Sequence, residues 1–142
     1  AGVNDGIPQD RRRQYGVIFT GGEPALQLDY ELVRMFRDAG FYAAIETNGT
    51  KDVSMLGLDW ITCSPKIAEH AVRCLSADEI KYVRGAGQGI PKPRCQATHK
   101  LLSPAFDGME MDREAVATCI KLVKENPEWR LSLQQHKFLR VR

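Results

Sequence analysis

The sequence predicts an α/β fold built on a mostly parallel β-sheet, and three observations support this prediction. Short apolar runs rich in β-branched and aromatic residues recur along the chain, and segments with helical periodicity separate several of them. The first runs show little polar alternation, which is typical of strands buried between two layers. A helix-length segment joins the first two runs, and such a strand–helix–strand unit places its strands parallel. We therefore expect a parallel sheet that is either open or part of a barrel.

The first half of the expected fold follows from the order of these patterns. Residues 1–14 are polar and end in three consecutive arginines, so we expect a linker or loop that precedes one domain over 15–142. A strand buried on both faces is predicted over 15–20, and a second buried strand over 41–45. Between them a helix is predicted to begin after Asp29 and to end at Gly40. Its apolar stripe would consist of Leu28, Leu32, Met35, Phe36 and Ala39.

The second half is less regular but continues the same alternation. Further strands are predicted over 58–63, 79–83, 100–104 and 129–134, with a short helix over 67–75. Several Gly and Pro residues between positions 84 and 98 predict an irregular loop. A helix is predicted over 112–124, followed by Asn126 and Pro127 as its stop. Its apolar face would carry Val116, Cys119, Ile120 and Val123.

Composition excludes several classes of protein. The chain has 142 residues, 43% of them hydrophobic and 27% charged, which is ordinary for a soluble globular domain. Its formal net charge of +2 is too small to indicate a basic surface for nucleic acid, so we expect no nucleic-acid partner. No segment approaches the roughly 20 apolar residues that span a bilayer, so we expect no membrane partner. No apolar signal region follows Ala1, so we expect a cytoplasmic protein, and the missing initiator Met suggests processing or a longer parent chain.

The spacing of the four cysteines predicts no metal site in this chain. Cys63, Cys74, Cys95 and Cys119 are separated by 11, 21 and 24 positions. No pair shows the gap of two to four residues that is common in metal-binding motifs. Without a secretory signal, disulfides are not expected either. The sequence therefore predicts reduced cysteines that pack as small buried hydrophobes.

Polar clusters follow four of the predicted strands, where α/β proteins place their ligands. Gly21 and Gly22 would let a ligand approach the backbone, and Glu23 offers a carboxylate to an ammonium group. Glu46 and Asn48 suit a ribose diol or a polar ring edge. The remaining clusters contain Ser64, Lys66, Gln134 and His136, of which Lys66 suits a carboxylate or phosphate. Each cluster has an alternative interpretation as an ordinary turn or a solvated side chain.

The joint occurrence of these motifs resembles the radical S-adenosylmethionine (SAM) superfamily and, within it, the 7-carboxy-7-deazaguanine synthases of the queuosine pathway. The resemblance covers about residues 15 to 142. It rests on the motifs FTGGEP at 19–24, AIETNG at 44–49, DWITCSPK at 59–66, EIK at 79–81 and WRLSLQQHK at 129–137. It implies a partial (β/α) barrel of the radical SAM type, truncated at its N-terminus.

The resemblance also implies an activity. Members of the family are lyases that contract the ring of 6-carboxy-5,6,7,8-tetrahydropterin with loss of ammonia, using SAM, a [4Fe–4S] cluster and Mg²⁺. By this resemblance Gly21, Gly22 and Glu23 would hold the amino group of SAM. Glu46, Asn48 and Ser64 would complete the SAM site, and Lys66, Gln134 and His136 would face the small pterin substrate. The protein's contribution would be positioning and electrostatics around a cofactor that carries the chemistry.

One departure from the family pattern concerns the cluster. Family members hold it with three closely spaced cysteines upstream of the GGEP motif, and no cysteine precedes Tyr15 here. We therefore expect a family fragment that does not cleave SAM by itself. Two alternatives remain: a cluster-free module that binds SAM or the pterin without catalysis, and an unrelated nucleotide-binding α/β domain, for which no P-loop motif is present. An edge strand at 15–20, or the family's own contacts, predicts a homodimer.

Overall fold

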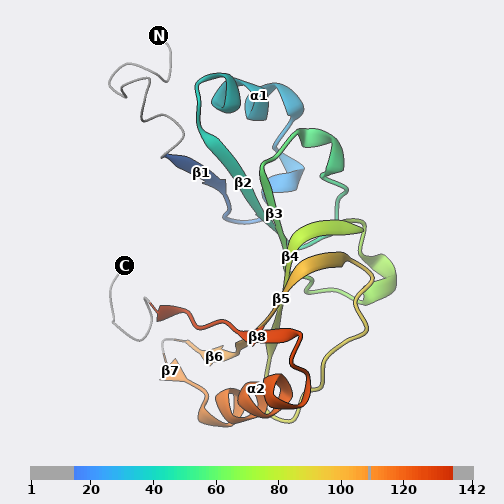
Figure 1. Ribbon diagram of the computed structural model, residues 1–142, viewed down its shortest axis with the longest axis vertical. Helices are drawn as coiled ribbons and strands as arrows, with labels where there is room; N and C mark the ends of the chain where they lie inside the picture. The colour runs from blue at the N-terminus through green and yellow to red at the C-terminus, as the bar shows by residue number, and fades with distance from the viewer. Residues whose placement is uncertain (1–14, 109, 136–142) are drawn as a thin grey trace.

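The computed structural model describes residues 15–108 and 110–135 and shows an α/β fold with a six-stranded parallel sheet (Figure 1). The strand order is β1-β2-β3-β4-β5-β8, and every neighbouring pair is parallel. The sheet strands are β1 (Gly16–Phe19), β2 (Tyr42–Thr47), β3 (Trp60–Cys63), β4 (Ser76–Arg84), β5 (Gln96–Pro104) and β8 (Trp129–Leu131). The strands form an open arc with the helices on its outer side, which confirms the predicted fold class.

The other elements are short. The helices are α1 (Tyr30–Asp38) and α2 (Arg113–Glu125), with three 3-10 turns at η2 (Pro24–Leu26), η3 (Ser54–Leu56) and η4 (Glu69–Ala71). A separate antiparallel pair, β6 (Phe106–Asp107) and β7 (Glu110–Met111), was not expected from the sequence. Among the described residues, no helix combines the length and apolar character that a membrane crossing needs.

Strand β1 does not have the two buried faces that its apolar sequence predicts. Among the residues that the structure describes, it lies at one edge of the sheet and pairs with β2 alone. Ile18 is 61% exposed in consequence, whereas Ala43 and Ile45 in β2 are fully buried. An apolar run therefore indicates a strand, but its burial depends on which layers the whole fold provides.

Helix α1 has the predicted ends, and its buried side agrees with the predicted stripe at Leu28, Phe36 and Ala39 but not at Leu32 and Met35. The Asp29 carboxylate accepts a hydrogen bond from the Leu32 amide at 2.8 Å, and Gly40 takes the left-handed conformation with φ 88° after the last turn. Val33 is the fully buried residue of the helix, while Leu32 and Met35 of the predicted stripe are 39% and 57% exposed. Because α1 packs mainly against β2, it buries a narrower side than a helix between two layers would.

Helix α2 covers the other end of the sheet, against β5 and β8. Asp112 caps its first turn by accepting hydrogen bonds from the amides of Glu114 and Ala115. Ala115 and Cys119 are its buried residues, whereas Ile120 of the predicted face is 38% exposed. The face toward the sheet therefore contains Cys119 and Val123 as predicted, with Ala115 and Leu122 in addition and without Ile120.

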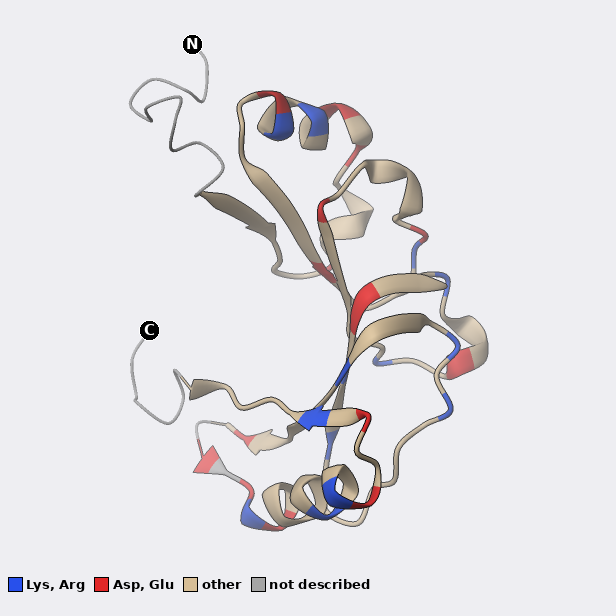
Figure 2. Cartoon of the chain, viewed as in Figure 1, with Lys and Arg blue, Asp and Glu red and all other residues tan. Residues whose placement is uncertain are grey.

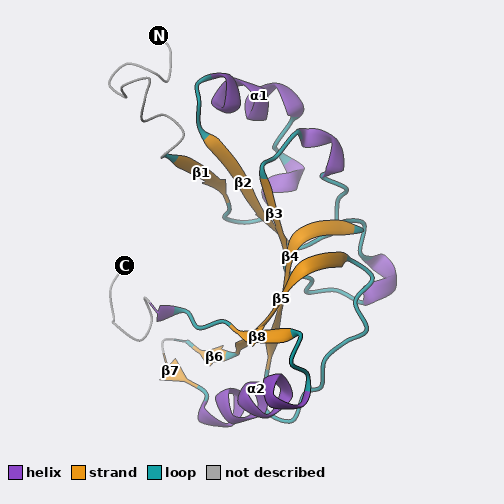
Figure 3. Ribbon diagram, viewed as in Figure 1, coloured by secondary structure: helices purple, strands orange, loops and turns teal. Residues whose placement is uncertain are grey.

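The middle of the sheet is covered by loops and short 3-10 turns instead of α-helices (Figure 3). The helix predicted over 67–75 is wrong, since only the three-residue turn η4 forms there. The amides of Arg73 and Cys74 both donate to the Gly49 carbonyl, which ties this segment to the end of β2. The irregular loop predicted after β4 is present over 85–95, and β5 begins directly after it.

Candidate functional site

The loops after the strands enclose a cavity of about 180 Å³ at the carboxyl ends of the sheet. The structure brings together the predicted residues Gly21, Gly22, Glu23, Glu46, Asn48, Ser64, Lys66 and Gln134 as parts of its lining. His136, the remaining predicted residue, lies outside the described residues. The parallel register explains this convergence, because it aligns the carboxyl ends of neighbouring strands on one side of the sheet.

Glu23 holds the first of these loops against the end of β2. Its Oε1 accepts hydrogen bonds from the Thr47 hydroxyl at 2.6 Å and from the Ala25 amide at 3.1 Å. Its Oε2 accepts a hydrogen bond from the Asn48 amide at 2.7 Å. Three of the roughly four acceptor positions of the carboxylate are therefore used within the protein, which leaves about one for a ligand.

The two glycines before Glu23 form an open part of the cavity wall. Gly21 has φ 112°, a conformation that residues with a side chain rarely adopt. A Cβ atom built on either Gly21 or Gly22 would meet no atom within 4 Å. The loop therefore keeps backbone groups accessible where a ligand can reach them.

Three charged side chains of the cavity are available to a ligand. Glu46, Lys66 and Lys81 line it and form no ion pair with another described residue. Ser64 also lines the cavity, and its hydroxyl donates to the Lys81 carbonyl at 2.9 Å. The cavity can thus pair with an ammonium group and a carboxylate of one ligand at the same time.

Sequence reasoning placed Thr47 and Lys81 within its motifs but gave neither a role in the site. Thr47 is 2% exposed, and its hydroxyl fixes Glu23, a role that becomes visible only when the loop and β2 are placed together. Lys81 lies in β4 and lines the cavity beside Val83, two residues farther along the strand. The period of two in β4 was the signal that could have placed Lys81 on the same face as Glu79. Thr47 instead shares the face of its register partner Cys63, and no periodic signal marks it.

A larger cavity of about 580 Å³ lies at the opposite, amino ends of the strands, beside α1. Its charged residues are already paired: Arg34 with Glu31 and Asp38, and Arg37 with Asp59. Helix α1 carries both acidic and basic residues (Figure 2). Because these charges neutralise one another, the smaller cavity at the carboxyl ends is the better ligand site.

Comparison with known proteins agrees with this geometry. No family model matches the chain. The 7-carboxy-7-deazaguanine synthase of Nitratidesulfovibrio vulgaris is 41% identical over 134 residues, covering 88% of this chain and 58% of that protein. The protein of the same name from Bordetella pertussis is 37% identical over 153 residues, covering 99% of this chain and 68% of that protein. The chain belongs to the 7-carboxy-7-deazaguanine synthase family.

A solved structure shows the same fold. The chain resembles the crystal structure of QueE from Escherichia coli with a TM-score of 0.61 and 29% sequence identity, over 84% of this chain and 56% of that one. The 7-carboxy-7-deazaguanine synthase of Bacteroides thetaiotaomicron is 39% identical and is matched over 65% of its length. The chain thus spans about three fifths of the length of these relatives.

The prediction that this member of the 7-carboxy-7-deazaguanine synthase family contains no possible metal site is wrong. Cys63, Cys74 and Cys95 are far apart in the sequence, yet their sulfur atoms all lie within 4.8 Å of one another. All four cysteines of the chain are free and buried, as predicted. Hydrogen bonds from the neighbouring thiols lower the pKa of Cys74, whereas donation to Cys74 raises the pKa of Cys63.

These three thiols do not fit the [4Fe–4S] cluster that the resemblance implies. They are at most 2% exposed, and a cube of four iron atoms would need to hold its thiolates farther apart than a single ion does. Their position is also unsuitable. Cys63 pairs in register with the core residue Ile80, while the next residue of β4, Lys81, lines the cavity. Since successive residues of a strand point to opposite faces, the thiols and the cavity lie on opposite faces of the sheet.

Proposed function

We propose that the chain forms the SAM-binding and substrate-binding wall of a 7-carboxy-7-deazaguanine synthase. The reaction would be the ring contraction of 6-carboxy-5,6,7,8-tetrahydropterin with loss of ammonia. The observation that carries this proposal is the convergence of four motif clusters on one cavity in a chain of this family.

The open glycine loop and the charges of the cavity suit the amino-acid part of SAM. Backbone groups of Gly21 and Gly22, with the remaining acceptor position of Glu23, would receive the ammonium group. Glu46 would accept hydrogen bonds from the ribose hydroxyls, and Asn48 and Ser64 would complete this side of the site. The described residues enclose only part of a SAM-sized ligand, since such sites usually measure about 300–1,000 Å³.

The positive charges would serve the pterin. Lys66 and Lys81 place two ammonium groups at the cavity, and the substrate carries a carboxylate. Gln134 lines the same cavity and would contact the polar edge of the ring, with His136 beside it along the chain. These residues would orient the substrate against SAM.

In this family the [4Fe–4S] cluster supplies the electron that cleaves SAM. The described cysteines do not fit that cluster, so we propose that this chain alone binds its ligands without turnover. A cluster-free binding module is the second candidate, and the position of the thiols behind the sheet is the observation that favours it. A Mg²⁺ requirement, a cytoplasmic location and a homodimer through the exposed edge of β1 are parts of the same proposal.

Calorimetric titration of the chain with SAM, and separately with the pterin, tests the binding proposal. We expect binding of both, weakened about tenfold for SAM in Glu46→Gln and for the pterin in Lys66→Ala, because each variant loses one charge-assisted contact. Lys121→Ala on α2 is the matched control, since its side chain is 74% exposed and does not line the cavity. Binding of ATP or GTP instead of SAM would contradict the proposal.

Iron and sulfide analysis after reconstitution tests whether the chain alone turns SAM over. We expect SAM to bind without uptake of iron and without release of 5′-deoxyadenosine. Iron in the chain together with release of 5′-deoxyadenosine would contradict both candidates as stated. Sedimentation tests the dimer, and a monomer at all concentrations would refute that part.

A further inference from the structure

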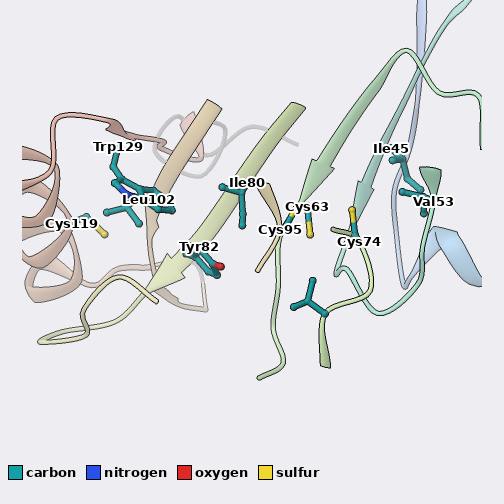
Figure 4. Packing of buried hydrophobic residues seen from close by; sticks show 11 residues of the cluster. Ile45, Val53, Cys63, Cys74, Ile80, Tyr82, Cys95, Leu102, Cys119 and Trp129 are labelled. Atoms are coloured by element: carbon teal, nitrogen blue, oxygen red, sulfur yellow. The ribbon is translucent and has the colours of Figure 1, made fainter. Parts of the chain in front are cut away.

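The three grouped thiols form a site of their own, independent of the proposed function. Each comes from a different segment: Cys63 ends β3, Cys74 lies two residues before β4, and Cys95 directly precedes β5. They are 0%, 1% and 2% exposed. Figure 4 shows them between Ile80 and Tyr82 on one side and Ile45 and Val53 on the other.

The separation of the sulfur atoms suits one small ion. A tetrahedral Zn²⁺ ion with Zn–S bonds of about 2.3 Å holds its thiolates about 3.8 Å apart. The observed sulfur atoms lie within 4.8 Å of one another without an ion. Movements of less than about 1 Å, which small side-chain rotations provide, would complete the coordination.

The donor type and the net charge of the occupied site narrow the choice of ion. Thiolates select soft ions such as Zn²⁺ and Cu⁺. With three thiolates, Zn²⁺ gives a net charge of −1 and Cu⁺ gives −2, and the smaller buried charge costs less. Arg73 and Arg94 directly precede two of the cysteines, and both guanidinium groups donate to the His70 carbonyl, at 3.5 and 2.5 Å. The two arginines thereby tie the segments that carry Cys74 and Cys95 to the turn η4.

The Glu69 carboxylate is already committed to other partners. Glu69 accepts hydrogen bonds from the Tyr82 hydroxyl at 2.6 Å and from the Arg94 amide at 2.8 Å. No fourth His, Cys, Asp or Glu ligand joins the group among the described residues. A water molecule would therefore take the fourth position.

The fold also has a place for such an ion. Loops, and not helices, cover this part of the sheet, and the connections before β4 and β5 have little secondary structure of their own. An ion bound to all three segments would join these connections to the end of β3. Metal binding would then contribute directly to folding stability.

We propose that Cys63, Cys74 and Cys95 together bind one Zn²⁺ ion that fastens the loops on the outer face of the sheet. On binding, the three thiols release their protons to solvent, and three sulfur–zinc bonds form without any oxidation or reduction.

Titration of the metal-free chain with Co²⁺, followed by displacement with Zn²⁺ or Cu⁺, tests this proposal. We expect about one ion per chain, a sulfur-to-cobalt charge-transfer band and a higher melting temperature with Zn²⁺. The variants Cys63→Ser, Cys74→Ser and Cys95→Ser should each bind at least about tenfold more weakly. Cys119→Ser is the matched control, because Cys119 is also free and buried but lies in α2, outside the group.

Circular dichroism establishes which variants fold, and native mass spectrometry of the unmodified chain gives the ion count independently of any variant. Absence of the charge-transfer band, or equal loss of binding in Cys119→Ser, would overturn the site. Preferential retention of Cu⁺ over Zn²⁺ would overturn the choice of ion. A disulfide between two of these cysteines after aerobic purification would overturn the metal site in favour of a redox-active cysteine pair.

Discussion

Replacing Glu23 with Gln tests whether this carboxylate holds the first site loop in place. The change keeps the size of the side chain but converts one acceptor oxygen into an NH₂ donor. With Oε1 retained, the new donor faces the Asn48 amide, which is itself a donor. In the flipped orientation it faces the Ala25 amide, and the Thr47 hydroxyl must turn to accept. Either way one backbone N–H loses its partner.

The cost follows from the three hydrogen bonds. A hydrogen bond to a charged group contributes about 1.5–3 kcal/mol, and an unsatisfied buried donor costs about 1–3 kcal/mol. Because the group is only partly buried, water offsets part of the loss. We therefore expect the free energy of unfolding to fall by about 2 kcal/mol.

Urea denaturation followed by circular dichroism measures this change. With a denaturant dependence of about 2 kcal/mol/M, the midpoint should move down by about 1 M. Glu46→Gln is the matched control, because Glu46 is an exposed carboxylate of the same cavity that forms no hydrogen bond through its side chain with a described residue. Its stability should change by less than about 0.5 kcal/mol.

Two results would refute the reasoning. If Glu23→Gln were as stable as the unmodified chain, the hydrogen bonds of the carboxylate would not hold the loop. If Glu46→Gln lost as much stability as Glu23→Gln, the effect would come from the charge at this edge of the sheet and not from the specific contacts.

The remaining predictions concern stability measured by the same denaturation. Gly49→Ala should cost about 2–5 kcal/mol, because φ is +79° and the new Cβ would lie 2.9 Å from the Cys63 sulfur. Gly87→Ala, with φ +69° and open space around it, should cost only about 1–2 kcal/mol, and equal losses would show that the close contact is unimportant. Asp112→Ala should cost about 1 kcal/mol through the lost cap of α2, and an unchanged midpoint would exclude that role. Leu102→Ala should cost about 2–5 kcal/mol, since Leu102 is fully buried, and a loss below about 1 kcal/mol would mean that the core closes around the gap.

Much of the fold could be predicted because its signals are local. Asp29 and Asp112 were recognisable as helix caps, since a short acceptor side chain before an apolar pattern is a property of a few neighbouring residues. The order of strands and helices could likewise be predicted from local residue patterns. The predicted burial was less accurate, as Ile18 and Met35 show, because the exposure of a side chain depends on which element covers it.

The helix predicted over 67–75 shows a second limit. A short apolar pattern there is compatible with a helix, but the amides of Arg73 and Cys74 instead donate to the carbonyl of Gly49, more than twenty positions earlier. Such a partner is invisible to local periodicity. Helix propensity is weak over so few residues, and one tertiary contact overrides it.

The sequence by itself determined the α/β class, the caps and the side of the sheet where the site residues meet. It could do so because strand register and parallel direction bring the residues that follow neighbouring strands to one edge. Only the tertiary structure decided that Glu23 holds its own loop and that Cys63, Cys74 and Cys95 meet behind the sheet. Their spacing of 11 and 21 positions matches no metal-binding motif, because folding, and not the sequence interval, sets the distance between residues on separate strands.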